Sequence, residues 1–139
     1  MRVSLGVLAG VATLAISAGP ALAHHSFAAE YDANKPVTLK GTVSKVEWMN
    51  PHARFYVEVR DDKGVVTSWN LELASPNVLT RNGWTRKSLN VGDEVVVEGS
   101  LAKDGSKMAN ARVVKLADGR RVFAGSSGGD APPPAQPQK

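Results

Sequence analysis

The 139-residue chain contains no cysteine, and this absence removes several classes of protein at once. Without a thiol there is no disulfide framework, no thiolate zinc or iron–sulfur site, no cysteine nucleophile and no lipidated-cysteine anchor. The chain also lacks a block of basic residues, and its 17 Lys+Arg only slightly exceed its 13 Asp+Glu. Such a small surplus, spread along the chain, by itself implies neither a nucleic-acid partner nor a membrane partner.

A long apolar run occurs only near the start of the chain. Met1-Arg2 is positively charged, residues 3–17 are mostly apolar, and Ala21-Leu22-Ala23 follows them. This order is typical of a signal peptide with an A-x-A cleavage site, and the run is shorter than the roughly 20 residues that cross a bilayer as a helix. We therefore expect residues 1–23 to be a signal peptide, and the mature protein to be periplasmic, without a membrane span, and to begin at His24.

The remaining chain divides into three parts by composition. Residues 24–35 are expected to form an extended N-terminal segment, and residues 36–124 a single β domain with one modest core. Residues 125–139 are rich in Gly, Ser and Pro, which predicts a disordered or polyproline II tail.

From Pro36 onward, apolar and polar residues alternate with a period of two between turns that contain Gly or Asp, which indicates β-strands. The first strand is predicted at 37–48, and its apolar phase changes near residues 41–45, as a bulge or strong bend produces. Further strands are predicted at 54–60, 65–73, 94–101, 109–116 and 121–123.

Ser75-Pro76 is typical of a helix start, and Gly83 of a helix end. The sequence therefore predicts one helix, from Pro76 to about Asn82, between the third and fourth strands, and no other helix in the mature protein. This order of elements predicts an all-β fold, a small OB-like barrel of five to six strands; a β-sandwich is the main alternative.

Several motifs together resemble a family of short exported proteobacterial proteins that is known as a domain of unknown function. They include His24-His25-Ser26-Phe27, Trp48-Met49-Asn50-Pro51-His52, Ser75-Pro76-Asn77 and Gly92-Asp93-Glu94-Val95. The resemblance covers nearly all of the mature chain up to about Ser126. It implies a periplasmic OB-like domain, and it brings no established activity or catalytic residue.

The three histidines are the strongest candidates for chemistry. His24, as the predicted mature N-terminus, would offer its amine and its ring Nδ1 to one metal ion, and His25 or His52 would add a second imidazole. Nitrogen ligands in a nearly planar set suit Cu(II), although another divalent metal is an alternative. The sequence therefore suggests a non-enzymatic binding protein with copper as its candidate ligand.

A weaker fourth ligand is available from Met49, Asp32 or Glu30. A thioether would favour Cu(I), whereas a carboxylate would favour Cu(II) or zinc. The alternative interpretation makes the terminal histidines a solvated end and His52 a turn residue whose ring hydrogen-bonds the backbone.

A second function class needs no metal. Arg54, Tyr56 and Arg60 share one phase of the strand at 54–60, and such a face would bind an envelope protein or a glycan. Nucleic acid is not expected, because the protein is predicted to be exported and has little net positive charge.

No enzyme is predicted. Ser26, His52 and Asp32 could in principle form a Ser/His/Asp triad, but the residues around Ser26 do not resemble a nucleophile elbow. No Gly-rich loop that would cradle a phosphate precedes a helix. The sequence leaves the partner and the oligomeric state open.

Overall fold

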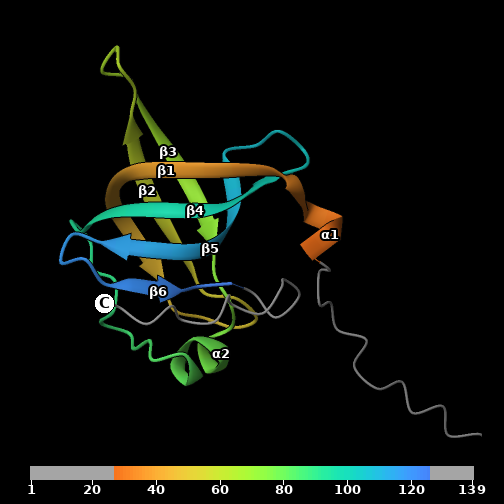
Figure 1. Ribbon diagram of the computed structural model, residues 1–139, viewed down its shortest axis with the longest axis vertical. Helices are drawn as coiled ribbons and strands as arrows, with labels where there is room; N and C mark the ends of the chain where they lie inside the picture. Colours follow the sequence, from red (N-terminus) through yellow and green to blue (C-terminus); the bar gives the residue numbers. More distant parts are fainter. Residues whose placement is uncertain (1–26, 126–139) are drawn as a thin grey trace, which may run out of the picture.

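The structure, a computed structural model, describes residues 27–125 (Figure 1). This part of the chain consists of strands and two short helices. In order they are α1 (Phe27–Glu30), β1 (Tyr31–Glu47), β2 (Arg54–Arg60), β3 (Val66–Glu72), α2 (Pro76–Arg81), β4 (Glu94–Ala102), β5 (Met108–Leu116) and β6 (Arg121–Phe123). Neither helix within the described residues is long and apolar enough to cross a membrane.

The strands form one sheet in the order β3-β2-β1-β4-β5-β6, and this sheet closes on itself. Closure comes from a parallel pairing of β3 with β5 over residues 70–72 and 108–110, while the other neighbouring strands are antiparallel. With α2 between β3 and β4, this is the topology of an OB-like barrel. The predicted fold class is confirmed, and the β-sandwich is excluded because there is one closed sheet rather than two.

The long strand β1 curves around the barrel and pairs with β2 on one side and β4 on the other (Figure 1). Its register with β2 shifts between Val43 and Lys45, where the sequence pattern predicts a bulge or bend. Gly41 lies just before this shift, and a Cβ atom there would be 2.2 Å from the carbonyl oxygen of Glu58. The absence of a side chain therefore lets β1 and β2 approach closely at the bend.

The N-terminal part of the domain differs from the prediction. Residues 27–30 form the helix α1 rather than extended chain, and β1 begins at Tyr31 rather than after residue 35. The prediction of a single helix is therefore wrong. Contacts distant in sequence stabilise α1: the backbone N–H of Lys103 donates to the carbonyl oxygen of Glu30 at 2.8 Å, and Tyr31 pairs with Ala102.

At the other end, Gly125 was expected to begin the tail, but it is buried. The predicted signal peptide, at residues 1–23, and the remainder of the predicted tail, at 126–139, lie outside the described residues.

The core fills the inside of the barrel and is almost entirely apolar. Helix α2 covers one end of it (Figure 1): Ser75 Oγ accepts a hydrogen bond from the backbone N–H of Val78, and Leu79 is buried. The largest fully buried side chains are Trp84, Tyr31, Phe55, Leu71, Leu73, Leu79, Val43, Val57, Val97 and Val114.

Trp84 ties the segment after α2 to the last strand. It is 2% exposed, and its Nε1 donates to the carbonyl oxygen of Phe123 at 2.8 Å. We expect Trp84→Phe to lower the free energy of unfolding by about 1–2 kcal/mol, because the Phe123 carbonyl loses its side-chain donor and the smaller ring leaves space in the core. Urea unfolding measures this loss. Trp69→Phe, at a half-buried tryptophan on β3, is the control, and an equal loss in both variants would contradict the assigned role of the hydrogen bond.

Candidate functional site

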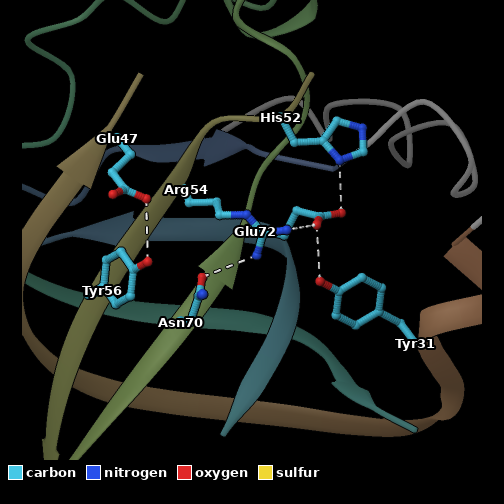
Figure 2. Close-up of polar contacts among 7 residues, drawn as sticks. All are labelled: Tyr31, Glu47, His52, Arg54, Tyr56, Asn70 and Glu72. Carbon is cyan, nitrogen blue, oxygen red and sulfur yellow. Dashed lines mark hydrogen bonds and ion pairs between the residues drawn. The ribbon is translucent and has the colours of Figure 1, made fainter. Parts of the chain in front are cut away.

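A buried carboxylate, that of Glu72, is the centre of the candidate site. Glu72 is the last residue of β3 and is 3% exposed. Its Oε2 accepts hydrogen bonds from the Tyr31 hydroxyl at 3.2 Å and from Arg54 Nη2 at 2.6 Å, and its Oε1 lies 3.0 Å from His52 Nδ1. Figure 2 shows these three side chains converging on the carboxylate from different directions.

Three separate parts of the chain supply the partners of Glu72. Tyr31 is the first residue of β1, and Arg54 is the first residue of β2 and lies directly opposite Glu72 in the β2–β3 register. His52 belongs to the connection between β1 and β2 and follows a cis peptide bond between Asn50 and Pro51. The barrel thus brings together residues that are 18 to 41 positions apart.

Within this cluster the positive charge of Arg54 pairs with the negative charge of Glu72. The guanidinium of Arg54 also donates from Nη1 to Asn70 Oδ1 at 3.3 Å, so two neighbouring side chains on β3 fix its orientation. Burial, and then the Glu72 carboxylate, raise the pKa of the Tyr31 hydroxyl well above its usual value. Tyr31 therefore remains a protonated hydrogen-bond donor at any physiological pH.

The ring of His52 is oriented by Glu72. With Nδ1 as the N–H that donates to the carboxylate, Nε2 carries the free lone pair of the neutral ring. The side chain is 15% exposed, so the ring is largely enclosed without being sealed from solvent. The ring's partner is a carboxylate, and not the backbone that the alternative interpretation of the sequence proposed.

Among the described residues, the other candidate metal ligands do not form a cluster around His52. His24 and His25 lie outside the described residues. Within residues 27–125, no group of three or more His, Asp or Glu side chains could hold a metal ion, so Asp32 and Glu30 do not complete such a set. Met49 is 52% exposed.

Neighbouring residues of the barrel form hydrogen bonds with the side chains of the predicted ligand face on β2. Arg54, Tyr56 and Arg60 share the outer phase of the strand, whose inner phase holds the buried Phe55 and Val57. Arg54 is held by β3, and the Tyr56 hydroxyl donates to Glu47 at 3.3 Å (Figure 2). Arg60 is exposed, and its Nη1 donates to the carbonyl oxygen of Gly64 at 2.9 Å.

Sequence reasoning missed Glu72 and Tyr31. Glu72 lies between Leu71 and Leu73, on the polar phase of its strand, where a carboxylate usually faces water. The one available signal was Tyr31 itself, an aromatic residue just before the predicted domain, which needed an apolar place to pack.

Comparison with solved structures finds a similarity to the mitochondrial single-stranded DNA-binding protein Rim1 of S. cerevisiae. The identity is 10%, the alignment covers 60% of this chain and 93% of that chain, and the TM-score is 0.48. No curated protein matches the sequence. A family profile, by contrast, matches residues 11–111, which is most of the chain. The chain therefore belongs to the family of unknown function DUF6152.

Proposed function

We propose that this protein is a non-enzymatic periplasmic binding protein that holds one Cu(II) ion between His52 and the histidines at its mature N-terminus. The observation that supports this proposal is the 3.0 Å contact between His52 Nδ1 and Glu72 Oε1. A histidine that binds a metal through one ring nitrogen commonly donates its other N–H to a carboxylate, which fixes the tautomer and raises the basicity of the ligating nitrogen.

The surroundings of Glu72 make His52 a rigid ligand. The carboxylate cannot turn away from the imidazole, because Tyr31 and Arg54 hold its other oxygen. Orienting a ligand before the metal arrives reduces the entropy that is lost on binding. His52 Nε2 is thus the one described imidazole nitrogen prepared to bind a metal ion.

We assign the remaining ligands to His24 and His25, because these residues precede Phe27 by only two or three positions. The described chain starts at Phe27, whose ring stacks on that of Tyr31 with centroids 5.8 Å apart, and Tyr31 contacts the same carboxylate as His52. The segment from His24 to Phe27 spans at most about 10 Å. After cleavage behind Ala23, the amine and ring of His24 would complete a set of nitrogen ligands suited to Cu(II).

Copper titration of the mature protein tests this proposal, once mass spectrometry has established that the chain begins at His24. We expect one Cu(II) per chain with nitrogen hyperfine structure in the electron paramagnetic resonance spectrum. His52→Asn should weaken binding by about 100-fold while the domain stays folded, because the amide keeps an N–H for Glu72 but removes Nε2.

A variant with one residue added before His24 is the second arm of this test. It should lose tight binding as well, because the chelating amine is displaced. If wild-type protein, His52→Asn and the extended variant all bind copper equally, the proposed site is refuted, and circular dichroism of each variant excludes unfolding as the cause of any loss.

A second candidate function is an interaction with an envelope protein or a glycan through the β2 face. The observation that favours it is the ring of Tyr56, which is half-buried on the outside of the barrel with Lys45 Nζ 5.2 Å from its centroid. An aromatic ring beside a cation, with Arg54 and Arg60 on the same face, suits a polar partner. This candidate predicts that His52→Asn leaves partner binding unchanged, and it involves no nucleic acid.

A further inference from the structure

A cavity of about 300 Å³ lies between α1, the loop that follows β4 and the start of β2. Its polar residues are Arg54, Lys103, Asp104 and Glu30, and its apolar lining includes Ala102 and Met108. Among the described residues no histidine lines it, and it therefore differs from the site around His52, although Tyr31 and Arg54 border both.

We propose that this cavity binds a free amino acid with an apolar side chain. The carboxylate of the ligand would lie against Arg54 and Lys103, its ammonium group against Asp104, and its side chain on Ala102 and Met108. This proposal does not depend on copper binding.

Arg54 is prepared to receive a carboxylate. Its guanidinium is held in place by Asn70 and Glu72, and those two contacts leave further N–H donors unused. The side chain is 27% exposed, and Arg54 is one of the residues that line the cavity. Glu72 neutralises the charge of Arg54, so the positive charge that attracts the ligand's carboxylate comes from Lys103. The Nζ of Lys103 donates to the carbonyl oxygen of Ala28.

Asp104 is a fixed and ionised partner for an ammonium group. Its Oδ1 accepts the backbone N–H of Ser106 at 2.9 Å, which orients the carboxylate within the hairpin turn. Hydrogen bonding from Ser106 also holds the pKa of Asp104 below its usual value, so the group is negatively charged at neutral pH.

The mixture of charges decides which class of ligand fits. Phosphate or sulfate would be attracted by Lys103 but repelled by Asp104 and Glu30. A simple cation would be attracted by the two carboxylates but repelled by Lys103. A zwitterion satisfies both signs. The volume lies at the lower end of the range for small-molecule sites, which suits an amino acid better than a nucleotide or a large cofactor.

Titration of the full mature protein with L-leucine, followed by ¹H–¹⁵N NMR after EDTA treatment, tests the proposal. The chelator is needed because amino acids bind copper themselves. We expect saturable shifts confined to residues 27–31, 54 and 102–108, with a Kd on the order of 1 mM, as a small ligand in an open site permits. Leucinamide, which lacks the carboxylate, should bind at least about 5-fold more weakly.

Two matched variants locate the ammonium site. Asp104→Asn should weaken leucine binding at least about 5-fold, but it should not weaken the binding of 4-methylpentanoate, which has no amine and is repelled by the Asp104 carboxylate. Asp118→Asn is the control, since Asp118 forms the same kind of turn, with Oδ1 2.9 Å from the Arg120 N–H, outside the cavity.

Four outcomes would overturn the proposal. These outcomes are the absence of shifts at about 20 mM leucine, shifts outside the cavity, equal leucine affinity in Asp104→Asn, and tighter binding of inorganic phosphate than of leucine. Because none of these measurements involves copper, a negative result here leaves the copper proposal standing, and a failed copper titration leaves this one standing.

Discussion

Replacement of Glu72 by alanine is expected to lower the free energy of unfolding by about 3 kcal/mol. The substitution removes the acceptor of the Tyr31 hydroxyl, the Arg54 guanidinium and the His52 ring at once. Arg54 is then a largely enclosed positive charge without its counter-ion. Removing one partner of a buried ion pair lowers stability by more than the intact pair contributes, because the other charge stays buried and unpaired. The expected value is at the low end for such pairs, because Arg54 is partly exposed and water screens its charge.

Urea unfolding followed by tryptophan fluorescence measures this effect, and a thermal scan should show a fall in Tm of roughly 15 °C for a domain of this size. Glu58→Ala is the matched control, because Glu58 is an exposed glutamate on the outer face of β2, and it should change stability by less than about 0.5 kcal/mol. Equal losses in the two variants would show that the contacts of Glu72 stabilise the fold no more than those of an exposed glutamate.

A double variant separates the charge from the packing. Suppose that Glu72→Ala lowers stability because it leaves Arg54 without its counter-ion. The double variant with Arg54→Met should then lose less free energy of unfolding than the two single variants lose in sum. Additive losses would instead place the effect in the packing around Tyr31.

The barrel strands could be predicted because their alternation is strong and local. The residues of β2 alternate between core and surface, with Phe55 and Val57 buried, so a period of two is visible in the sequence. The helix α2 could be predicted from Ser75 and Pro76 for the same reason, because a helix cap depends on neighbouring residues.

Elements that depend on distant contacts could not be predicted. Helix α1 is four residues long, too short to be stable by itself, and Lys103 anchors it from the β4–β5 loop. The sequence predicts Tyr31 in an extended segment before the domain, because nothing near it in sequence shows that Ala102 will pair with it.

The candidate site also contains one residue that local sequence predicts and others that depend on strand pairing. His52 could be selected from its place beside Asn50-Pro51, since residues between strands often carry function. Its partner Glu72 is 20 residues further along the chain (72 − 52), and the register that brings Arg54 opposite Glu72 becomes visible only when β2 and β3 pair. A polar residue on the outer phase of a strand is indistinguishable in sequence from a solvent-exposed one.

Gly41→Ala is expected to lower the free energy of unfolding by about 3 kcal/mol, through steric overlap alone. The new Cβ would lie 2.2 Å from the carbonyl oxygen of Glu58 and 2.6 Å from Val57 Cγ1. The first neighbour is backbone of the paired strand and the second is a buried side chain, so neither moves without disturbing the β1–β2 pairing or the core.

Gly64→Ala is the informative control for this prediction. Gly64 lies in the β2–β3 turn with φ of +83°, and a Cβ atom added there would have no neighbour within 4 Å, so alanine would suffer backbone strain without a clash. That strain is about 1–2 kcal/mol. Chemical denaturation of both variants therefore compares overlap with strain. A smaller loss for Gly41→Ala than for Gly64→Ala would mean that β1 and β2 separate easily at the bend, and that the curvature of β1 does not depend on the missing side chain.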